Sequence, residues 1–132
     1  MKKVLDVLLV TMTADSSDSG YAARVLLMAK MLKKAGKKVG VVRFIPAFHA
    51  APSWRNDLSK EGCDEVIEKK ILPISRYAIF RWLMTWYANI YLFLLYRRMD
   101  IHCVQAEAHE AANAVLALIR PKCKVIVDFH GA

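Results

Sequence analysis

Short apolar runs alternate with segments of helical periodicity along most of this 132-residue chain. Branched residues fill the apolar runs almost continuously, which is typical of strands covered on both faces in a parallel sheet. Such strands, alternating with helices, are joined by crossovers and not by hairpins. The pattern therefore predicts an α/β fold with a Rossmann-like, mainly parallel sheet flanked by helices. The predicted strands cover residues 4–10, 39–45, 101–106 and 125–129, with a weaker one at 65–72.

Three segments between these runs have the periodicity of helices. The first begins at Gly20 and ends near Gly36, where basic neighbours and a glycine favour a helix terminus. The segment 46–59 is rich in proline and polar residues, so we expect a loop there that could carry a short helix. The predicted helices cover residues 20–36, 76–98 and 111–119.

Length and composition favour one domain over residues 1–132. The hydrophobic content of 56% is high for a small domain and indicates apolar surface that meets a partner, another domain or lipid. A net charge of +8 favours anionic partners such as phosphorylated ligands, acidic lipid headgroups or nucleic acid, and charge alone does not choose among these. Of these partners, we expect no nucleic acid. Three cysteines without a CxxC pair, and an N-terminus without a signal-peptide pattern, predict a cytoplasmic location.

The helix predicted at residues 76–98 combines aromatic residues with flanking arginines. Fifteen positions that begin at Trp82 carry no charge, a run shorter than the roughly 20 residues that cross a bilayer. Such a helix suits the headgroup region of an anionic membrane, at the inner face of which the protein would be peripheral. The alternative is packing against the sheet on one side and a missing domain or neighbouring chain on the other. The residues expected at this surface are Trp82, Trp86, Arg97 and Arg98.

Polar residues follow the predicted strands at one edge of the sheet. In an open parallel sheet, ligands bind outside the carboxyl ends of the strands, beside the helix N-termini. The carboxylates and imidazoles there could ligate a metal or act as acid and base, but the same residue types cap helices, and we predict no metal site. Gly20 fits neither common phosphate-loop pattern, so a plain helix start stays an open interpretation. The residues selected are Ser19, Gly20, His49, Glu107, His109, Asp128 and His130.

Two stretches resemble the N-terminal domain of a family 4 type glycosyltransferase. They are residues 7–42, with the polar loop ending in Gly20, and residues 100–131, with the strand-end pattern Asp128-Phe129-His130-Gly131. The resemblance implies one half of a two-domain GT-B architecture, from which the C-terminal donor domain is missing. It also implies transfer of a sugar from a nucleotide-sugar donor to a glycan or lipid-linked acceptor, in cell-surface polysaccharide synthesis. By itself the 132-residue chain would be inactive.

The same resemblance implies roles for the residues at the carboxyl edge. His130 would be the catalytic contact to the transferred sugar, and Ser19 with Gly20 would face the donor phosphates. No cofactor beyond the nucleotide-sugar substrate is implied. The residues left to line the cleft or the acceptor site are His49, Glu107, His109 and Asp128.

Two other classes of protein stay open. One is a non-enzymatic α/β module that docks on a membrane or a protein through the aromatic helix. The other is a doubly wound domain of the flavodoxin or receiver kind that binds a small ligand. Receiver chemistry fits poorly, because Asp15, Asp18 and Asp128 do not form the acidic cluster that it needs.

Overall fold

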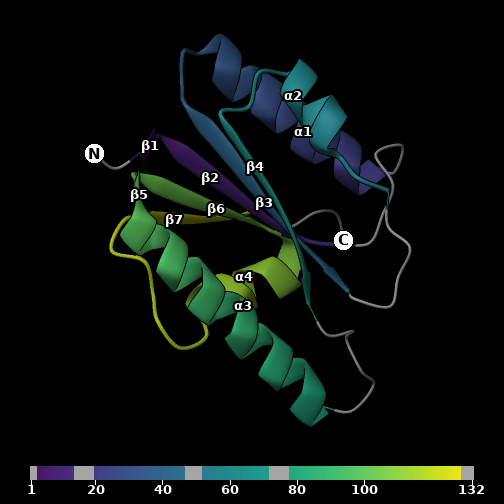
Figure 1. Ribbon diagram of the computed structural model, residues 1–132, viewed down its shortest axis with the longest axis vertical. Helices are drawn as coiled ribbons and strands as arrows, with labels where there is room; N and C mark the ends of the chain where they lie inside the picture. The colour runs from purple at the N-terminus through teal and green to yellow at the C-terminus, as the bar shows by residue number, and fades with distance from the viewer. Residues whose placement is uncertain (1–2, 14–19, 47–51, 72–77, 129–132) are drawn as a thin grey trace.

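A five-stranded parallel sheet with helices on both faces forms the centre of the molecule (Figure 1). The computed structural model describes residues 3–13, 20–46, 52–71 and 78–128. Every neighbouring pair of strands in this sheet is parallel, so the predicted Rossmann-like, mainly parallel α/β fold is confirmed. In order across the sheet, the strands are β4 (Glu65–Ile71), β3 (Val39–Pro46), β2 (Val7–Met12), β6 (Cys103–Glu107) and β7 (Lys124–Asp128).

A two-stranded sheet precedes β2 and β6, beyond a break in each strand. It consists of β1 (Lys3–Leu5) and β5 (Met99–Ile101), which are parallel. At the first break, the Asp6 amide donates to the Lys38 carbonyl, and the Lys38 amide donates to the Asp6 carboxylate, both at 2.8 Å. The single strand predicted over residues 4–10 is therefore two strands, because Asp6 bonds to the chain that enters β3. The amide of His102 donates to the Leu5 carbonyl at 3.0 Å, at the break between β5 and β6.

The helices lie in pairs on opposite faces of the sheet (Figure 1). On one face, α1 ends beside Gly36, whose φ of 79° is left-handed, as predicted. A short helix, α2, overlaps the segment 46–59, where we expected a loop that could carry a short helix. On the other face, α4 is earlier than predicted: it starts directly after β6. The bounds are α1 (Gly20–Lys34), α2 (Arg55–Lys60), α3 (Ala78–Arg98) and α4 (Ala108–Leu116).

Alternate residues of the central strand β2 supply two separate cores. Leu9 faces α1, where it packs with Val25 in one buried cluster. Leu8 and Val10 belong to the other cluster, which includes Leu92 of α3. Each of these side chains is fully buried, and burial of one such side chain stabilises a fold by about 1.5–3 kcal/mol. The apolar strand pattern thus reflects a sheet that is covered on both sides.

A buried polar cluster closes the face that carries α1 and α2. The Arg43 guanidinium donates to Glu68 at 2.9 Å and to the Pro52 carbonyl at 2.6 Å, and it lies 4.2 Å from the centre of the Trp54 ring. Glu68 also accepts hydrogen bonds from the Ser53 hydroxyl and the Trp54 amide. Burial alone would raise the pKa of Glu68, but these hydrogen bonds and the charge of Arg43 lower it below its usual value. The cluster fixes the start of α2 against the sheet.

Candidate functional site

The strand order reverses between β2 and β6, and the carboxyl ends of these strands form one candidate site. From β2 the chain continues to β3 and β4 on one side, whereas β6 and β7 follow on the other. Ligands of doubly wound sheets bind at such a switch point. Across it, the Tyr21 hydroxyl donates to the Glu107 carbonyl at 2.5 Å. This bond places the start of α1, and with it Gly20, beside the end of β6.

Two predicted site residues lie on neighbouring strands at this edge. Glu107 and Asp128 are paired in the register of β6 and β7. The Glu107 side chain is 1% exposed and accepts a hydrogen bond from Gln105 at 2.8 Å. Two carboxylates at adjacent strand ends favour hydroxyl or amine groups and disfavour a phosphate. Gln105 and Tyr21 were not predicted, although a polar residue inside an apolar strand was a usable signal for Gln105.

Four of the predicted site residues cannot be placed against this edge. Ser19, His49 and His130 lie outside the described residues, and so does the side chain of His109 in the first turn of α4. Their roles stay predictions. Among the described residues, no group of three or more His, Cys, Asp or Glu side chains could hold a metal ion.

The solvent side of α3 is a second candidate site. We call it the α3 apolar face, and its exposed residues are Trp82, Leu83, Trp86, Tyr87, Ile90 and Leu94. Each of these side chains is between 40% and 52% exposed. Their spacing of three, four and seven residues puts them on one side of the helix. The opposite side, with Met84, Ala88 and Leu92, is buried against the sheet.

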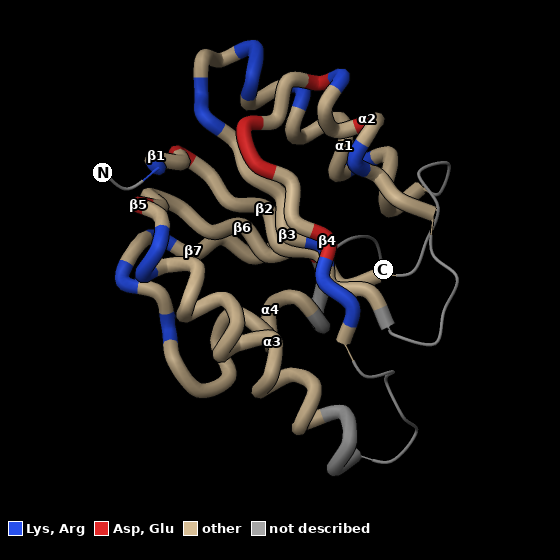
Figure 2. The backbone as a smooth tube through the Cα atoms, in the orientation of Figure 1, with Lys and Arg blue, Asp and Glu red and all other residues tan. Residues whose placement is uncertain are grey.

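Cations flank the α3 apolar face at its margins. The Lys69 ammonium, from the edge strand β4, lies 5.6 Å from the centre of the Tyr91 ring. At the end of the helix, Arg97 lies 5.9 Å from the Phe93 ring, and Arg98 follows. Figure 2 shows basic residues at the C-terminal end of α3 and on β4, and no acidic residue along the described part of the helix. An aromatic and aliphatic strip bordered by positive charge is the result.

Within the described ranges, no helix is both long enough and apolar enough to cross a bilayer.

Comparisons with known proteins bear on the fold. No protein-family model and no curated protein matches the chain. Two solved structures of the C-terminal domain of a hydrogenase from Pyrococcus furiosus match with a TM-score of 0.67, at 9% and 12% identity. These matches cover 97% and 98% of this chain and 95% and 94% of the other. A universal stress protein from Archaeoglobus fulgidus matches with a TM-score of 0.46 and 17% identity, over 93% of each chain.

These findings contradict the resemblance to a family 4 glycosyltransferase. The structures that match with a TM-score of 0.67 are of a hydrogenase domain, and they give no support to sugar transfer or polysaccharide synthesis. The physical reason is that apolar strands, a glycine at a helix start and a polar strand end recur in many doubly wound sheets with different functions. The donor, acceptor and second domain implied by the resemblance stay untested. What the comparisons show is that this chain has an α/β fold shared with the hydrogenase domain.

Proposed function

We propose that this protein is a peripheral docking module that attaches to anionic membrane surfaces through the α3 apolar face. The observation that carries the proposal is the exposure of six large apolar side chains on one side of a helix whose other side is already buried. Large exposed apolar patches mark interaction sites. All six residues of the α3 apolar face belong to the described part of the chain, whereas Ser19, His49 and His130 of the carboxyl edge do not, so α3 is the better-defined site.

The chemistry of the face favours a lipid surface as the partner. Tryptophan and tyrosine rings suit the headgroup region, where one part of the ring is in apolar surroundings and the other is wet. Lys69, Arg97 and Arg98 lie at the margins, where they would meet anionic headgroups as the helix lies in the membrane plane. The net charge of +8 adds attraction at long range. Peripheral attachment from the cytoplasmic side agrees with these features.

Co-sedimentation with vesicles tests the proposal. The chain should pellet with vesicles of phosphatidylglycerol and phosphatidylcholine, less with phosphatidylcholine alone, and less again as salt screens the charges. Replacing both Trp82 and Trp86 by serine should lower the membrane partition coefficient by about tenfold or more, because two aromatic side chains no longer enter the interface.

A matched control comes from α1, on the opposite face of the sheet. Leu27 and Met31 are 56% and 58% exposed, so their exposure equals or exceeds that of the tryptophans. The double replacement Leu27→Ser and Met31→Ser should leave vesicle binding nearly unchanged. Equal loss in both double variants, or no binding at low salt, would show the proposal to be wrong. Self-association that the tryptophan variant abolishes, without vesicle binding, would identify a protein interface instead.

A further inference from the structure

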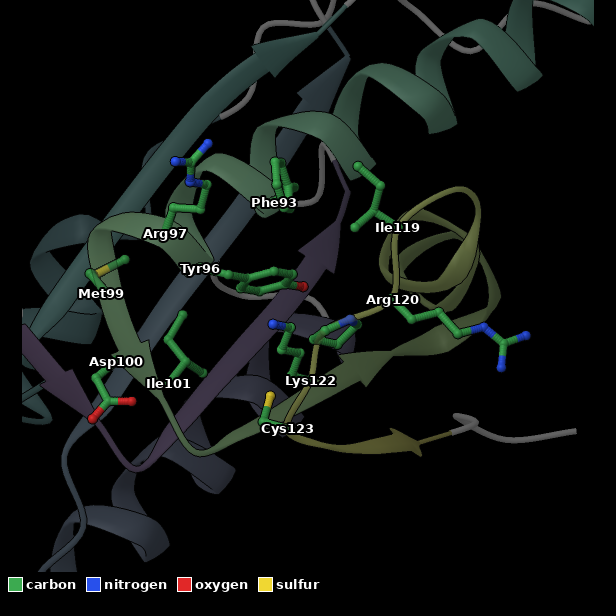
Figure 3. A pocket seen from close by; sticks show the side chains of 11 residues that line it. Phe93, Tyr96, Arg97, Met99, Asp100, Ile101, Ile119, Arg120, Lys122 and Cys123 are labelled. Carbon is green, nitrogen blue, oxygen red and sulfur yellow. The ribbon is translucent and has the colours of Figure 1, made fainter.

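A cavity of about 490 Å³ lies beside the last turns of α3, away from the carboxyl edge of the sheet (Figure 3). Its walls come from α3, from β5 and from the segment that joins α4 to β7. The volume lies within the range of about 300–1,000 Å³ that small-molecule sites occupy. Apolar and aromatic walls make up most of its lining and include Phe93, Tyr96, Met99, Ile101 and Ile119.

Positively charged residues outnumber negatively charged ones in the lining of the cavity. Arg97, Arg120 and Lys122 are set against a single carboxylate, that of Asp100. Arg97 is in the last turn of α3, where it offsets the partial negative charge of the helix end. In Figure 3 the guanidinium groups of Arg97 and Arg120 point outward, and Lys122 lies beside the Tyr96 ring. The cavity therefore has an apolar interior and a cationic rim.

Tyr96 contributes an apolar ring to the wall of this cavity. The Tyr96 hydroxyl is buried and has no hydrogen-bond partner among the described residues. Burial raises the pKa of Tyr96 well above its usual value, so the hydroxyl stays a neutral donor. Because the hydroxyl has almost no contact with solvent, a ligand in the cavity would meet the ring of Tyr96 and not its hydroxyl.

The wall is also held rigid from behind. Asn89, buried in α3, donates to the carbonyl of Ile119 at 3.0 Å and accepts from the amide of the same residue at 2.9 Å. Ile119 and its neighbour Arg120 line the cavity. A wall that is fixed before binding lowers the entropy cost of binding a ligand.

We propose that this cavity binds an amphipathic anion. Its apolar part would lie against Phe93, Tyr96 and Ile101, and its phosphate or carboxylate would lie at the rim, held by Lys122 and Arg120. A lipid taken from a bilayer and a free single amphiphile share this chemistry. The proposal is separate from membrane attachment, because the cavity lies at the last turns of α3 and its lining includes none of the six residues of the α3 apolar face.

Titration calorimetry with dihexanoyl phosphatidic acid, below its critical micelle concentration, tests the proposal. The chain should bind it at one saturable site. Lys122→Glu should weaken binding by about tenfold or more, because a charge-assisted hydrogen bond is replaced by repulsion. Lys124→Glu is the matched control: it makes the same change at an exposed position two residues on, outside the cavity lining, and should change the affinity less than about twofold.

Two further ligands test the class of molecule. Inorganic phosphate lacks the apolar part and neutral dihexanoyl phosphatidylcholine lacks the net charge, so each should bind at least about tenfold more weakly. Equal binding of either ligand, equal loss in both lysine variants, or no saturable binding would overturn the proposal.

The Trp82→Ser and Trp86→Ser double variant separates this proposal from membrane attachment. It should retain dihexanoyl phosphatidic acid binding even where it no longer pellets with vesicles. Loss of both properties in that variant would contradict a separate cavity site. To distinguish the sources, the protein is mixed with vesicles that contain labelled phosphatidic acid, and the vesicles are then removed. If labelled lipid stays on the protein, the ligand can be taken from a bilayer. If no labelled lipid is found on the protein, the ligand is a free amphiphile from solution.

Discussion

Helices α1 and α3 cover opposite faces of one sheet, yet they present different surfaces to solvent. Each buries one apolar side against the strands. On its outer side α1 exposes charged residues around Leu27 and Met31, whereas α3 exposes the six residues of its apolar face. Packing in the core therefore explains the apolar residues on the inner side of both helices. It does not explain the residues on the outer side of either helix. The outer side of α3 has a composition that folding does not require, and this is why we interpret it as a binding surface.

The two faces also differ in the kind of polar group that is buried between the helices and the sheet or between the helices themselves. Beneath α1 and α2, a charged pair, Arg43 and Glu68, is buried beside Trp54. Between α3 and α4, the neutral side chain of Asn89 bonds to backbone groups of both α4 and the turn that follows it. The stability that the Arg43–Glu68 pair gives depends on charge and pH, whereas the stability that the Asn89 hydrogen bonds give does not.

The largest expected effect is at the charged pair. Arg43→Met should lower the free energy of unfolding by about 3–5 kcal/mol, because Glu68 then remains buried without its cation. Urea denaturation measures this change. Lys3→Met, which breaks an exposed pair with Glu65, is the control and should cost less than about 1 kcal/mol.

A double variant sharpens the interpretation of that loss. Arg43→Met combined with Glu68→Leu removes both charges and should be more stable than Arg43→Met alone. If the double variant is no more stable, then the packing of Arg43 on Trp54, and not the charge of Glu68, accounts for the effect.

The sequence predicted the sheet well, because each buried strand is a local apolar run between helices. It also indicated the exposure of Trp82 and Trp86, since a charge-free helix of that length has more apolar surface than one sheet face can bury. Asp6 is a charged residue inside the first predicted strand, but the break there depends on a bond to Lys38, far along the chain.

Contacts between distant segments were beyond the reach of the sequence. Tyr21 meets Glu107 across the switch point, and Lys122 meets the end of α3 at the cavity. Neither pair has a local signature, because each depends on how crossovers bring loops together. The glycosyltransferase resemblance was wrong for a related reason: its motifs report the geometry of strand ends and helix starts, which many functions share.

The second largest effect is expected at Asn89. Asn89→Ala should lower the free energy of unfolding by about 3 kcal/mol, since buried backbone groups of residues 114, 115 and 119 lose their partner. Asn113→Ala, at an exposed position of α4, is the control and should stay within about 0.5 kcal/mol. Equal stability of the two variants would mean that water replaces the side chain of Asn89.

A smaller effect is expected from acid, and it should arise on the face of α1 and α2. Burial would raise the pKa of Glu68, but its hydrogen bonds and Arg43 lower it below the ordinary 4.5 in the folded state. The stabilisation by ionised Glu68 is therefore fully present above that value and is lost as the pH falls through the lowered pKa. Urea midpoints of the wild type should decrease more steeply below about pH 4.5 than those of Glu68→Gln. Parallel pH profiles would assign acid sensitivity to other carboxyl groups, such as Asp6 and Asp64, whose pKa values are also lowered.

The smallest effect is expected where α3 faces solvent, and it separates the binding surface from the core. Trp82→Ser should change the free energy of unfolding by no more than about 0.5 kcal/mol, because the side chain is half exposed. Leu92→Ala, on the buried side of the same helix, should cost about 2–5 kcal/mol through the cavity that it leaves. Urea denaturation of both variants, beside their vesicle binding, gives four independent results. A stable Trp82→Ser protein with weakened vesicle binding is the result expected of a docking surface. If Trp82→Ser instead destabilises the fold as much as Leu92→Ala, the outer side of α3 belongs to the folding core, and the contrast with α1 has no functional meaning.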